Sequence, residues 1–261
     1  MNKVKRVIHG FIKYKYLLVQ LVKKGVILRY RRSYLGLIWT LLEPFLNMLV
    51  LTFVFGTLFG TSDKTYPVYI LSGRLLYSCF SQSTKAALRS IRANRGMINK
   101  VYVPKYLYPL SSVLYSYVIF LFSLIVLVLV AAFLKIWPTP YLFLAVIPMT
   151  LLLLLSIGVG MILSTLGVFF RDMEYIWDVL LMLLMYLCAI FYYPDRFVSV
   201  GRGWVLDYNP LYCIITQFRN CIYGLPLEPF YVLYSGLWCL ITLIIGFGVF
   251  YKRQDKFILY I

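Results

Sequence analysis

The stretch from Tyr106 to Leu134 reads YLYPLSSVLYSYVIFLFSLIVLVLVAAFL and contains no charged residue. A helix of about 20 apolar residues is enough to cross the roughly 30 Å hydrocarbon core of a bilayer. Because this stretch exceeds that length and carries no charge, it predicts a membrane-spanning helix over 110–134. We therefore expect part of this chain to lie in a membrane and to contact lipid.

Composition extends this prediction to the whole chain. Hydrophobic residues make up 62% of the 261 residues, charged residues only 13%, and the mean hydropathy is +0.84. An ordinary globular chain is about 45–50% apolar and about 25% charged. A chain with so little polar surface does not coat a soluble particle. The predicted fold class is therefore an all-α integral membrane protein.

The apolar pattern predicts six transmembrane helices within a domain that covers residues 35–261. Their bounds lie near 36–60, 67–87, 110–134, 142–168, 176–193 and 230–251. The first span contains Glu43, and the second, weaker one contains Arg74. Charges at such depth are costly, so each is expected to have a partner or a wet cavity.

The distribution of basic residues predicts that both termini are cytoplasmic. With that orientation, 20 of the 26 Lys and Arg residues lie on the cytoplasmic side and 5 on the external side. Such an asymmetry follows the positive-inside rule. A net charge of +17 would suggest nucleic acid in a soluble chain. Here the basic clusters flank the spans, so no nucleic-acid partner is expected.

Residues 1–34 are predicted to form an amphipathic helix in the cytoplasmic interface. Apolar residues recur near helical spacing with lysines between them, at Val4, Val7, Ile8 and Phe11 and again at Leu17, Leu18, Leu21 and Val22. The segment lacks the apolar core of a signal peptide. Lysines at an interface anchor a helix by extending to water. A docking surface for a soluble partner has the same pattern, so both interpretations stay open.

The external stretch 194–229 is long for a loop and contains a helical segment. Asn209-Pro210 is a typical helix start and Gly224 a typical helix stop. The helix between them is too short to cross the bilayer with its flanks, which favours an external re-entrant or interfacial helix. Irregular backbone at membrane depth persists where it packs in protein or lines a wet cavity. The segment therefore suggests the mouth of a pore.

The residues expected of a membrane enzyme are absent from the sequence. There is no phosphate-binding loop of the GxxxxGK[ST] type, and His9 is the single histidine. The five cysteines show no CxxC spacing; Cys213 and Cys221 would either pair in an oxidising compartment or remain buried thiols. We therefore expect no catalytic site, no metal and no cofactor on this chain.

Two sets of residues are candidates for lining an interior space. Glu43 and Arg74 lie at similar predicted depths, which leads to the hypothesis that they face one space and pair; the alternative is that each separately reaches interfacial water. Aromatic side chains on spans one and five suit a sugar chain, since rings stack on sugars and tyrosine hydroxyls form hydrogen bonds. Interfacial belts and packing would also use them. These aromatic candidates are Trp39, Phe55, Phe59, Tyr186, Phe191, Tyr192 and Tyr193.

Several short segments together resemble a known family over nearly the whole chain. They are Leu28–Trp39 (LRYRRSYLGLIW) with Glu43-Pro44, Leu71–Gly73, Asn94–Pro104, Phe169–Asp172, Asn209-Pro210, Phe218-Arg219 with Gly224, and Gly246 and Phe250 before the basic tail. In this order they resemble the permeases of type-2 ABC exporters, in the subgroup that exports lipid-linked polysaccharides and teichoic acids. One departure is Arg74, where the family more often has an apolar residue.

The resemblance implies a channel-forming permease in the bacterial plasma membrane that moves polysaccharide of O-antigen, capsule or teichoic acid type outward. It implies a homodimer in contact with membrane lipid, and two copies of a cytoplasmic ATPase that hold ATP and Mg²⁺. Spans one and five would line the conduit, and the region of Asn209, Pro210 and Arg219 would shape its exit. The implied ATPase contacts are Arg29, Tyr30, Arg31, Arg32, Arg92, Asn94, Asn99, Lys100, Lys105, Arg171 and Asp172.

Other functions remain as alternatives. A drug or lipid exporter of the same superfamily would be smooth and closed at mid-membrane. A secondary transporter would need intramembrane acidic residues for ion coupling and repeated halves, whereas Glu43 is alone and no repeat is visible. A membrane glycosyltransferase would need a carboxylate cluster, for which only Asp172, Glu174 and Asp178 are near enough in sequence.

Overall fold

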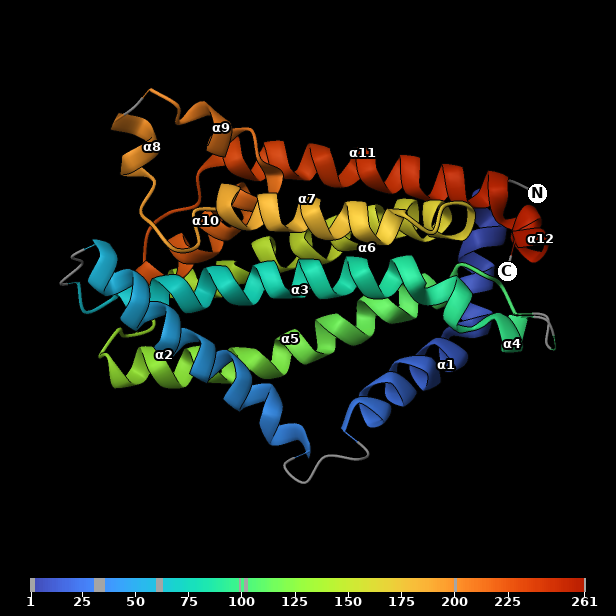
Figure 1. Cartoon of the computed structure of the whole chain (residues 1–261), viewed down its shortest axis with the longest axis horizontal. Coiled ribbons are helices and arrows are strands. Elements are labelled where there is room, and N and C mark those ends of the chain that lie inside the picture. The colour runs from blue at the N-terminus through green and yellow to red at the C-terminus, as the bar shows by residue number, and fades with distance from the viewer. Residues whose placement is uncertain are drawn as a thin grey trace.

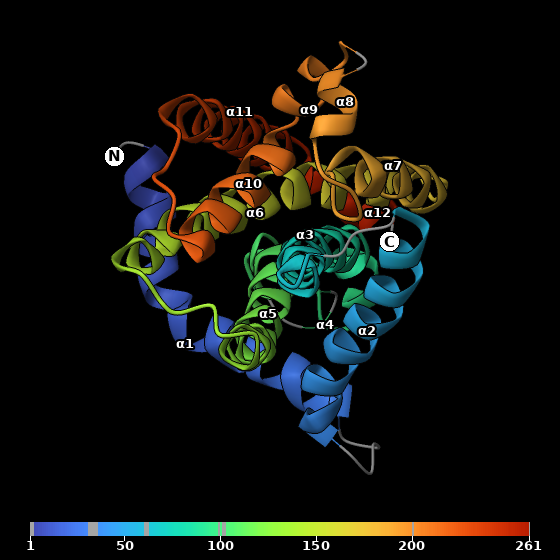
Figure 2. The same ribbon diagram turned by 90° about the vertical axis from the view of Figure 1, so that its left-hand side faces the viewer.

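Helix α3 (Tyr66–Ala93) lies at the centre of the fold, with 18 of its 28 residues buried. The structure is a computed structural model that describes residues 3–30, 36–59, 63–98, 100, 103–199 and 201–260. Figure 2 shows α3 surrounded by helices that contact it. They include α2 (Trp39–Phe59), α5 (Leu107–Phe133), α6 (Val146–Phe169), α7 (Met173–Leu187) and α10 (Pro210–Tyr223).

The other elements lie around this centre, and every regular element in the described ranges is helical. They are α1 (Lys3–Tyr30), α4 (Arg95–Ile98), α8 (Asp195–Ser199), α9 (Trp204–Asp207), α11 (Pro229–Arg253), α12 (Phe257–Tyr260) and three short 3-10 turns at Gly36–Ile38, Pro140–Ala145 and Gln254–Lys256. In Figure 1 both chain ends lie at one end of the bundle with α4 and α12, and α8 to α10 lie at the other end. The chain termini are therefore separated from α8, α9 and α10 by the length of the bundle.

Four of the described helices are long and apolar enough to cross a membrane. They are α2, α5, α6 with the turn before it, and α11. Helix α3 carries Arg74, Lys85, Arg89 and Arg92, and α7 has 15 residues, about 22 Å at 1.5 Å per residue. These two helices are the second and fifth of the six predicted spans. The chain is a multi-pass membrane protein. It has six transmembrane helices if α3 and α7 cross the membrane in addition to the four helices above.

Helices α6 and α11 approach closely because small residues face each other. A Cβ atom at Gly246 would lie 2.6 Å from the carbonyl oxygen of Gly158, and a Cβ at Gly158 would meet the backbone of Thr242 and Leu243. Lipid supplies little hydrophobic drive between helices, so membrane helices associate through close contacts of this kind. The pair forms one side of the bundle around α3.

Helix α1 is amphipathic where its side chains are described. Leu17, Leu18, Leu21 and Val22 are partly buried, while the flanking Lys15, Lys23 and Lys24 are exposed. Further along α1, Gly25 lies against the ring of Tyr115 on α5, where an added Cβ would come within 3.1 Å of the ring. The helix therefore packs its apolar face on the bundle at the end that contains both chain termini.

The helix predicted between Asn209-Pro210 and Gly224 is present with these limits. Helix α10 begins after Asn209, whose side-chain oxygen accepts a hydrogen bond from the backbone N–H of Leu211 at 3.1 Å. It ends at Gly224, which has φ of +74° and forms the left-handed cap that glycine favours. Its apolar residues are buried against α3, α6 and α11, so α10 is part of the core rather than a surface loop.

Candidate functional site

A row of polar residues occupies the accessible side of α3. Arg74, Ser78 and Gln82 lie four residues apart and are partly exposed, whereas Leu75 and Cys79 beside them are buried. Residues at this spacing share one face of a helix, so the three side chains form a polar stripe. Polar side chains among membrane helices mark a wet or interior surface rather than a lipid contact.

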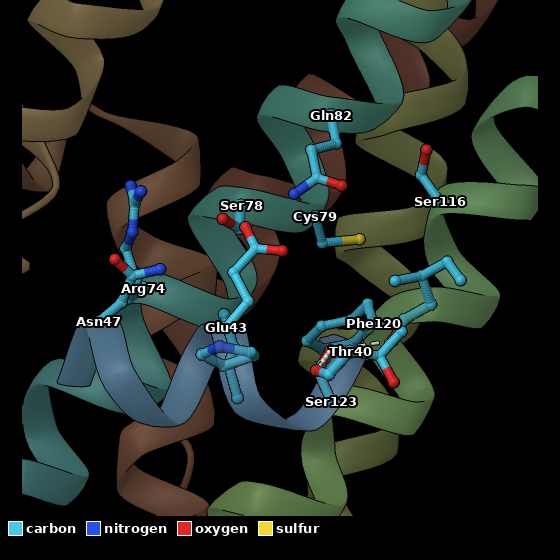
Figure 3. A pocket seen from close by; sticks show the side chains of 13 residues that line it. Thr40, Glu43, Asn47, Arg74, Ser78, Cys79, Gln82, Ser116, Phe120 and Ser123 are labelled. Carbon is cyan, nitrogen blue, oxygen red and sulfur yellow. Dashed lines mark hydrogen bonds between the residues drawn. The ribbon is translucent and has the colours of Figure 1, made fainter. Parts of the chain in front are cut away.

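The polar stripe forms one wall of a pocket of about 50 Å³ between α3, α2 and α5 (Figure 3). The pocket is lined by Thr40, Glu43, Pro44, Asn47, Arg74, Leu75, Ser78, Cys79, Gln82, Ser116, Ile119, Phe120 and Ser123. A cavity needs about 10–15 Å³ to hold one water molecule. The pocket therefore has room for a few waters, and a sugar would have to lie across the stripe rather than within it.

Both intramembrane charges predicted from the sequence, Glu43 and Arg74, line this pocket. The Arg74 Nη1 atom lies 3.6 Å from the sulfur of Met185 on α7, and the guanidinium lies 5.8 Å from the centre of the Tyr77 ring. In Figure 3 the guanidinium points away from the Glu43 carboxylate, which lies beside Ser78. The two residues line one pocket, as the depth argument expects, but among the described side chains no ion pair joins them.

Helix α7 makes a series of polar contacts with α3, and Leu181 is its single buried residue. Glu174 accepts hydrogen bonds from Arg89, at 2.7 Å, and from Arg92. Lys85 pairs with Asp178 at 2.8 Å. Further along, the Trp177 indole donates to Thr84 Oγ1 at 3.0 Å, and the Tyr77 hydroxyl donates to the Leu181 carbonyl at 2.6 Å. We call this series of contacts the α3–α7 polar seam.

The helical part of the predicted fifth span ends at Leu187, before the predicted boundary at 193. Residues 188–193 form an irregular segment in which Ala189 has φ of +45°. Its carbonyl groups are bonded by tyrosines of α3: Tyr66 donates to Phe191 at 2.6 Å, and Tyr69 donates to Ala189 and Tyr192, each at 2.9 Å. Irregular backbone inside a membrane protein needs such partners. These bonds account for the early end of the helix.

Arg219 of α10 is buried in the same region, with 5% of its surface exposed. Its Nη1 and Nη2 atoms donate to the carbonyls of Ala189 and Tyr69, both at 3.1 Å, and its Cζ atom lies 3.5 Å from the centre of the Tyr69 ring. A side chain at Gly73 would collide with the guanidinium. Arg219 thus joins α10, α3 and the segment after α7. Of the residues predicted to lie near Arg219, Asn209 reaches the end of α7, where it donates to the Leu187 carbonyl at 3.1 Å.

The predicted aromatic candidates divide between exposed and packed positions. Trp39 and Tyr186 are exposed at 43% and 52%. Phe191 is buried, stacked on Phe55 with ring centres 4.8 Å apart, and Phe55 in turn stacks on Phe59. These three rings hold α2 against the end of α7 in the single chain.

Two further tyrosines of this group anchor loops. Tyr192 donates to the Tyr186 carbonyl at 2.5 Å, and Tyr193 donates to the Asp63 carboxylate at 2.8 Å. Burial acts to raise the pKa of Asp63, but hydrogen bonds from the backbone and side chain of Thr65 and from Tyr193 outweigh it and hold this pKa below its ordinary value. Asp63 is therefore a charged anchor between the start of α3 and the segment after α7.

Among the described residues, the predicted ATPase contacts from Arg92 to Asp172 lie at the end of the bundle that contains the termini, and several have partners within the chain. Arg92 binds Glu174, and Asn94 donates to the Ser90 carbonyl at 2.8 Å. Lys105 donates to the Gln254 carbonyl at 2.7 Å; burial lowers its pKa, and Asp255 opposes that effect.

The other predicted ATPase contacts are exposed or lie beyond the description. Lys100, Arg171 and Asp172 are exposed. Arg31, Arg32 and Asn99 lie outside the described residues, as do the side chains of Arg29 and Tyr30.

Sequence reasoning missed the residues that hold α7 in place. Tyr66 and Tyr69 were not among the candidates, although they lie three residues apart on one helix face and buried tyrosines usually need hydrogen-bond partners. Lys85, Arg89 and Arg92 face Glu174 and Asp178, and this complementarity across two helices was a visible signal.

The structure also bears on metal and disulfide chemistry. Within the described ranges no cluster of three His, Cys, Asp or Glu side chains is placed to hold a metal ion. All five cysteines have buried, free thiols, Cys213 and Cys221 included.

Comparison with known proteins connects these features to a family. Residues 16–223 match the ABC-2 type transporter family. The chain is 30% identical to an O-antigen export system permease protein RfbA of Klebsiella pneumoniae, over 92% of this chain and 93% of that protein. It is 27% identical to an RfbA of Myxococcus xanthus, over 97% and 98%. It is 26% identical to a polysialic acid transport protein KpsM of Escherichia coli, over 94% and 96%.

Proposed function

The chain belongs to the ABC-2 type transporter family, and from this premise we propose that it is the permease of an ATP-driven polysaccharide exporter. Members of this family are transport subunits that pair with separate ATPase subunits. The substrate would be a lipid-linked polymer of O-antigen, capsule or teichoic acid type, as the names of the full-length relatives suggest. Transport would run outward across the bacterial plasma membrane.

The observation that carries the proposal is the polar stripe of α3, which lies between α2 and α7 on the surface of the single chain. Helix α2 has only Thr40 and Met48 buried, and α7 only Leu181. Arg74 and Gln82 would be costly neighbours for lipid. A stripe of amide, hydroxyl and guanidinium groups is, in contrast, well suited to water and sugar hydroxyls.

Two copies of the chain would enclose this surface. A closed pair with twofold symmetry would bring two polar stripes to face each other, with α2 and α7 as the walls between them. The conduit would then have the exposed Trp39 and Tyr186 at its margins. The packed rings of Phe55, Phe59 and Phe191 would support the wall from behind.

In this proposal α3 and α7 serve as the second and fifth of six spans, and both termini are cytoplasmic. Helix α3 has the length of a span, and its basic residues Lys85, Arg89 and Arg92 gather at the end shared with the termini. That end would face the cytoplasm, consistent with the positive-inside rule. Helix α10 would be a re-entrant helix at the external mouth, held by Arg219.

The ATPase would bind the cytoplasmic end. Lys100, Arg171 and Asp172 are exposed there, and we assign them to direct contact together with Arg29, Tyr30, Arg31, Arg32 and Asn99. Arg92 and Lys105 have partners in the chain, so we assign them to shaping the surface. ATP and Mg²⁺ would bind the partner and not this chain.

Capture of the tagged chain from native membranes in mild detergent tests this function. Mass spectrometry should find an ATPase in stoichiometric amount, and the cells should lose surface polysaccharide when the phosphate-loop lysine of that partner is replaced. Capture of the chain alone, with normal surface polysaccharide in a strain that lacks it, would refute the proposal. The main alternative, a drug or lipid exporter, predicts the ATPase without the loss of polysaccharide.

A further inference from the structure

Arg74 differs from the other basic residues of α3 in its contacts. Lys85 pairs with Asp178, and Arg89 and Arg92 pair with Glu174. Arg74 continues the same side of α3, but the α7 residue opposite it is Met185. Among the described residues no carboxylate forms an ion pair with Arg74. Its charge is therefore not neutralised in the way that the seam neutralises the other three.

The contacts that Arg74 does make leave most of its hydrogen-bonding capacity unused. A guanidinium has five N–H donors. The thioether of Met185 is a weak acceptor for one of them, and the Tyr77 ring, 5.8 Å away, attracts the charge without accepting a full hydrogen bond. Arg74 is partly exposed on the polar stripe, so the remaining donors are accessible from the surface.

We propose that Arg74 binds an oxyanion of the exported polymer, a phosphate or a carboxylate, as the polymer passes over the polar stripe. The proposal rests on the export function proposed above. The planar guanidinium presents paired N–H groups that match both oxyanions. Ser78 and Gln82, one and two turns along, would meet the neighbouring sugar hydroxyls. The pocket of about 50 Å³ is too small for a sugar ring, so the ligand lies across the stripe.

The arrangement of charge supports an anion over a neutral sugar. The Glu43 carboxylate is turned toward Ser78 and away from the guanidinium in Figure 3. The other acidic groups near this face, Glu174 and Asp178, are occupied by basic partners. A positive centre with its acidic neighbours turned away or paired is available to an incoming anion. The oxyanion could belong to the phosphate that links glycan to lipid or to acidic sugars along the chain.

Equilibrium binding to the permease–ATPase complex in lipid nanodiscs tests the proposal. Calorimetric titration would use three probes: an oligogalacturonate, a neutral malto-oligosaccharide of equal length, and a polyprenyl diphosphate without sugar. The variants are Arg74→Gln and Arg74→Lys. Glutamine keeps hydrogen-bond donors without the charge, and lysine keeps the charge without the paired N–H groups of the guanidinium. Lys64→Gln removes an exposed positive charge just before the same helix and is the matched control.

We expect Arg74→Gln to weaken binding of at least one anionic probe about tenfold or more, since hydrogen bonds to charged groups have that order of effect. Arg74→Lys should lose less, and Lys64→Gln and the neutral probe should be unaffected. Loss for the diphosphate identifies the lipid linkage as the source, and loss for the oligogalacturonate identifies acidic sugars.

Unchanged binding of both anionic probes by Arg74→Gln, equal loss for the neutral probe, or no anion binding by the wild type would overturn the proposal. Each variant is first checked for recovery as a complex with the ATPase. The proposed export function is tested separately, by the capture experiment described above. If that function is wrong, the tagged chain is captured without an ATPase.

Discussion

The guanidinium carbon of Arg219 lies 3.5 Å from the centre of the Tyr69 ring, and the same guanidinium donates to the backbone carbonyl of this tyrosine at 3.1 Å. Its second donor bonds Ala189, directly after the break in α7. One side chain thus ties helix α10 to the central helix and to the end of a proposed conduit wall. The position of α10 therefore depends on α3 and not only on its own caps.

Replacing Arg219 with Ala should destabilise the chain by about 2–4 kcal/mol, because two carbonyls lose a charged donor in a buried place. The melting temperature of the purified protein in detergent measures the effect. Arg202→Ala, on the exposed part of the same external segment, is the control and should have little effect. Equal shifts for the two variants would contradict the role given to Arg219.

Gly73→Ala should also destabilise, by about 1–3 kcal/mol, because the added methyl group meets the fixed guanidinium of Arg219. Gly248→Ala in α11 is the matched control: its methyl group would meet nothing within 4 Å, and the change should be neutral or slightly stabilising. In the double variant Gly73→Ala/Arg219→Ala the two losses should be less than additive. Full additivity in the melting temperatures would show that the two positions do not interact.

The fold could be predicted where local sequence decides it. Asn209 and Gly224 define α10 by cap chemistry that lies within a few residues of each helix end. The end of α7 could not be found in this way, since it depends on Tyr66 and Tyr69, more than a hundred residues earlier in the chain. Cys188–Tyr193 is apolar enough to continue a helix as far as Pro194, and the tertiary donors account for its earlier end.

The candidate site was predictable to a similar extent. Glu43 and Arg74 were predicted to lie at similar depths and to face one space, and both line the same pocket. This prediction was possible because the rise per residue of a helix is regular and successive spans run in opposite directions. It did not give the direction of the Arg74 side chain, which depends on Met185 of another helix. Side-chain direction between helices is a property of packing, and a single sequence carries little information about it.

Glu174→Gln should loosen the α3–α7 polar seam, because Arg89 and Arg92 both lose their shared carboxylate. Exposed ion pairs contribute about 0.2–1 kcal/mol each, so the chain should remain folded. Backbone amides of α7 should exchange hydrogen several-fold faster, and the coupling of ATP hydrolysis to export should decline. Glu228→Gln, an exposed acidic residue before α11, is the control. No change in exchange within α7 would mean that apolar packing alone holds this helix.

Asp63→Asn should lower the melting temperature by about 2–4 °C at pH 7, because the Thr65 and Tyr193 hydrogen bonds lose a charged acceptor. The folded-state pKa of Asp63 lies below its ordinary value. Its contribution is therefore complete above the unfolded-state pKa of about 3.9 and declines as pH falls through the lower, folded-state value. Melting curves of both proteins between pH 7 and pH 3 should converge at the acid end. A constant difference across this range would assign the effect to something other than the carboxylate charge.

Thiol labelling distinguishes a wet conduit wall from a lipid surface. Maleimides react with the thiolate, which forms in water and is suppressed in apolar surroundings. Cysteines introduced as Ser78→Cys on the polar stripe and Asn47→Cys beside it should therefore react with a water-soluble maleimide in native membranes at least tenfold faster than Val128→Cys. Val128 is 62% exposed but lies on the apolar outer side of α5, so the comparison separates water access from simple exposure. The five native thiols are buried, which keeps the wild-type background low. Equal rates at the three positions would place the stripe against lipid, and the proposed conduit would then have to lie elsewhere on the chain.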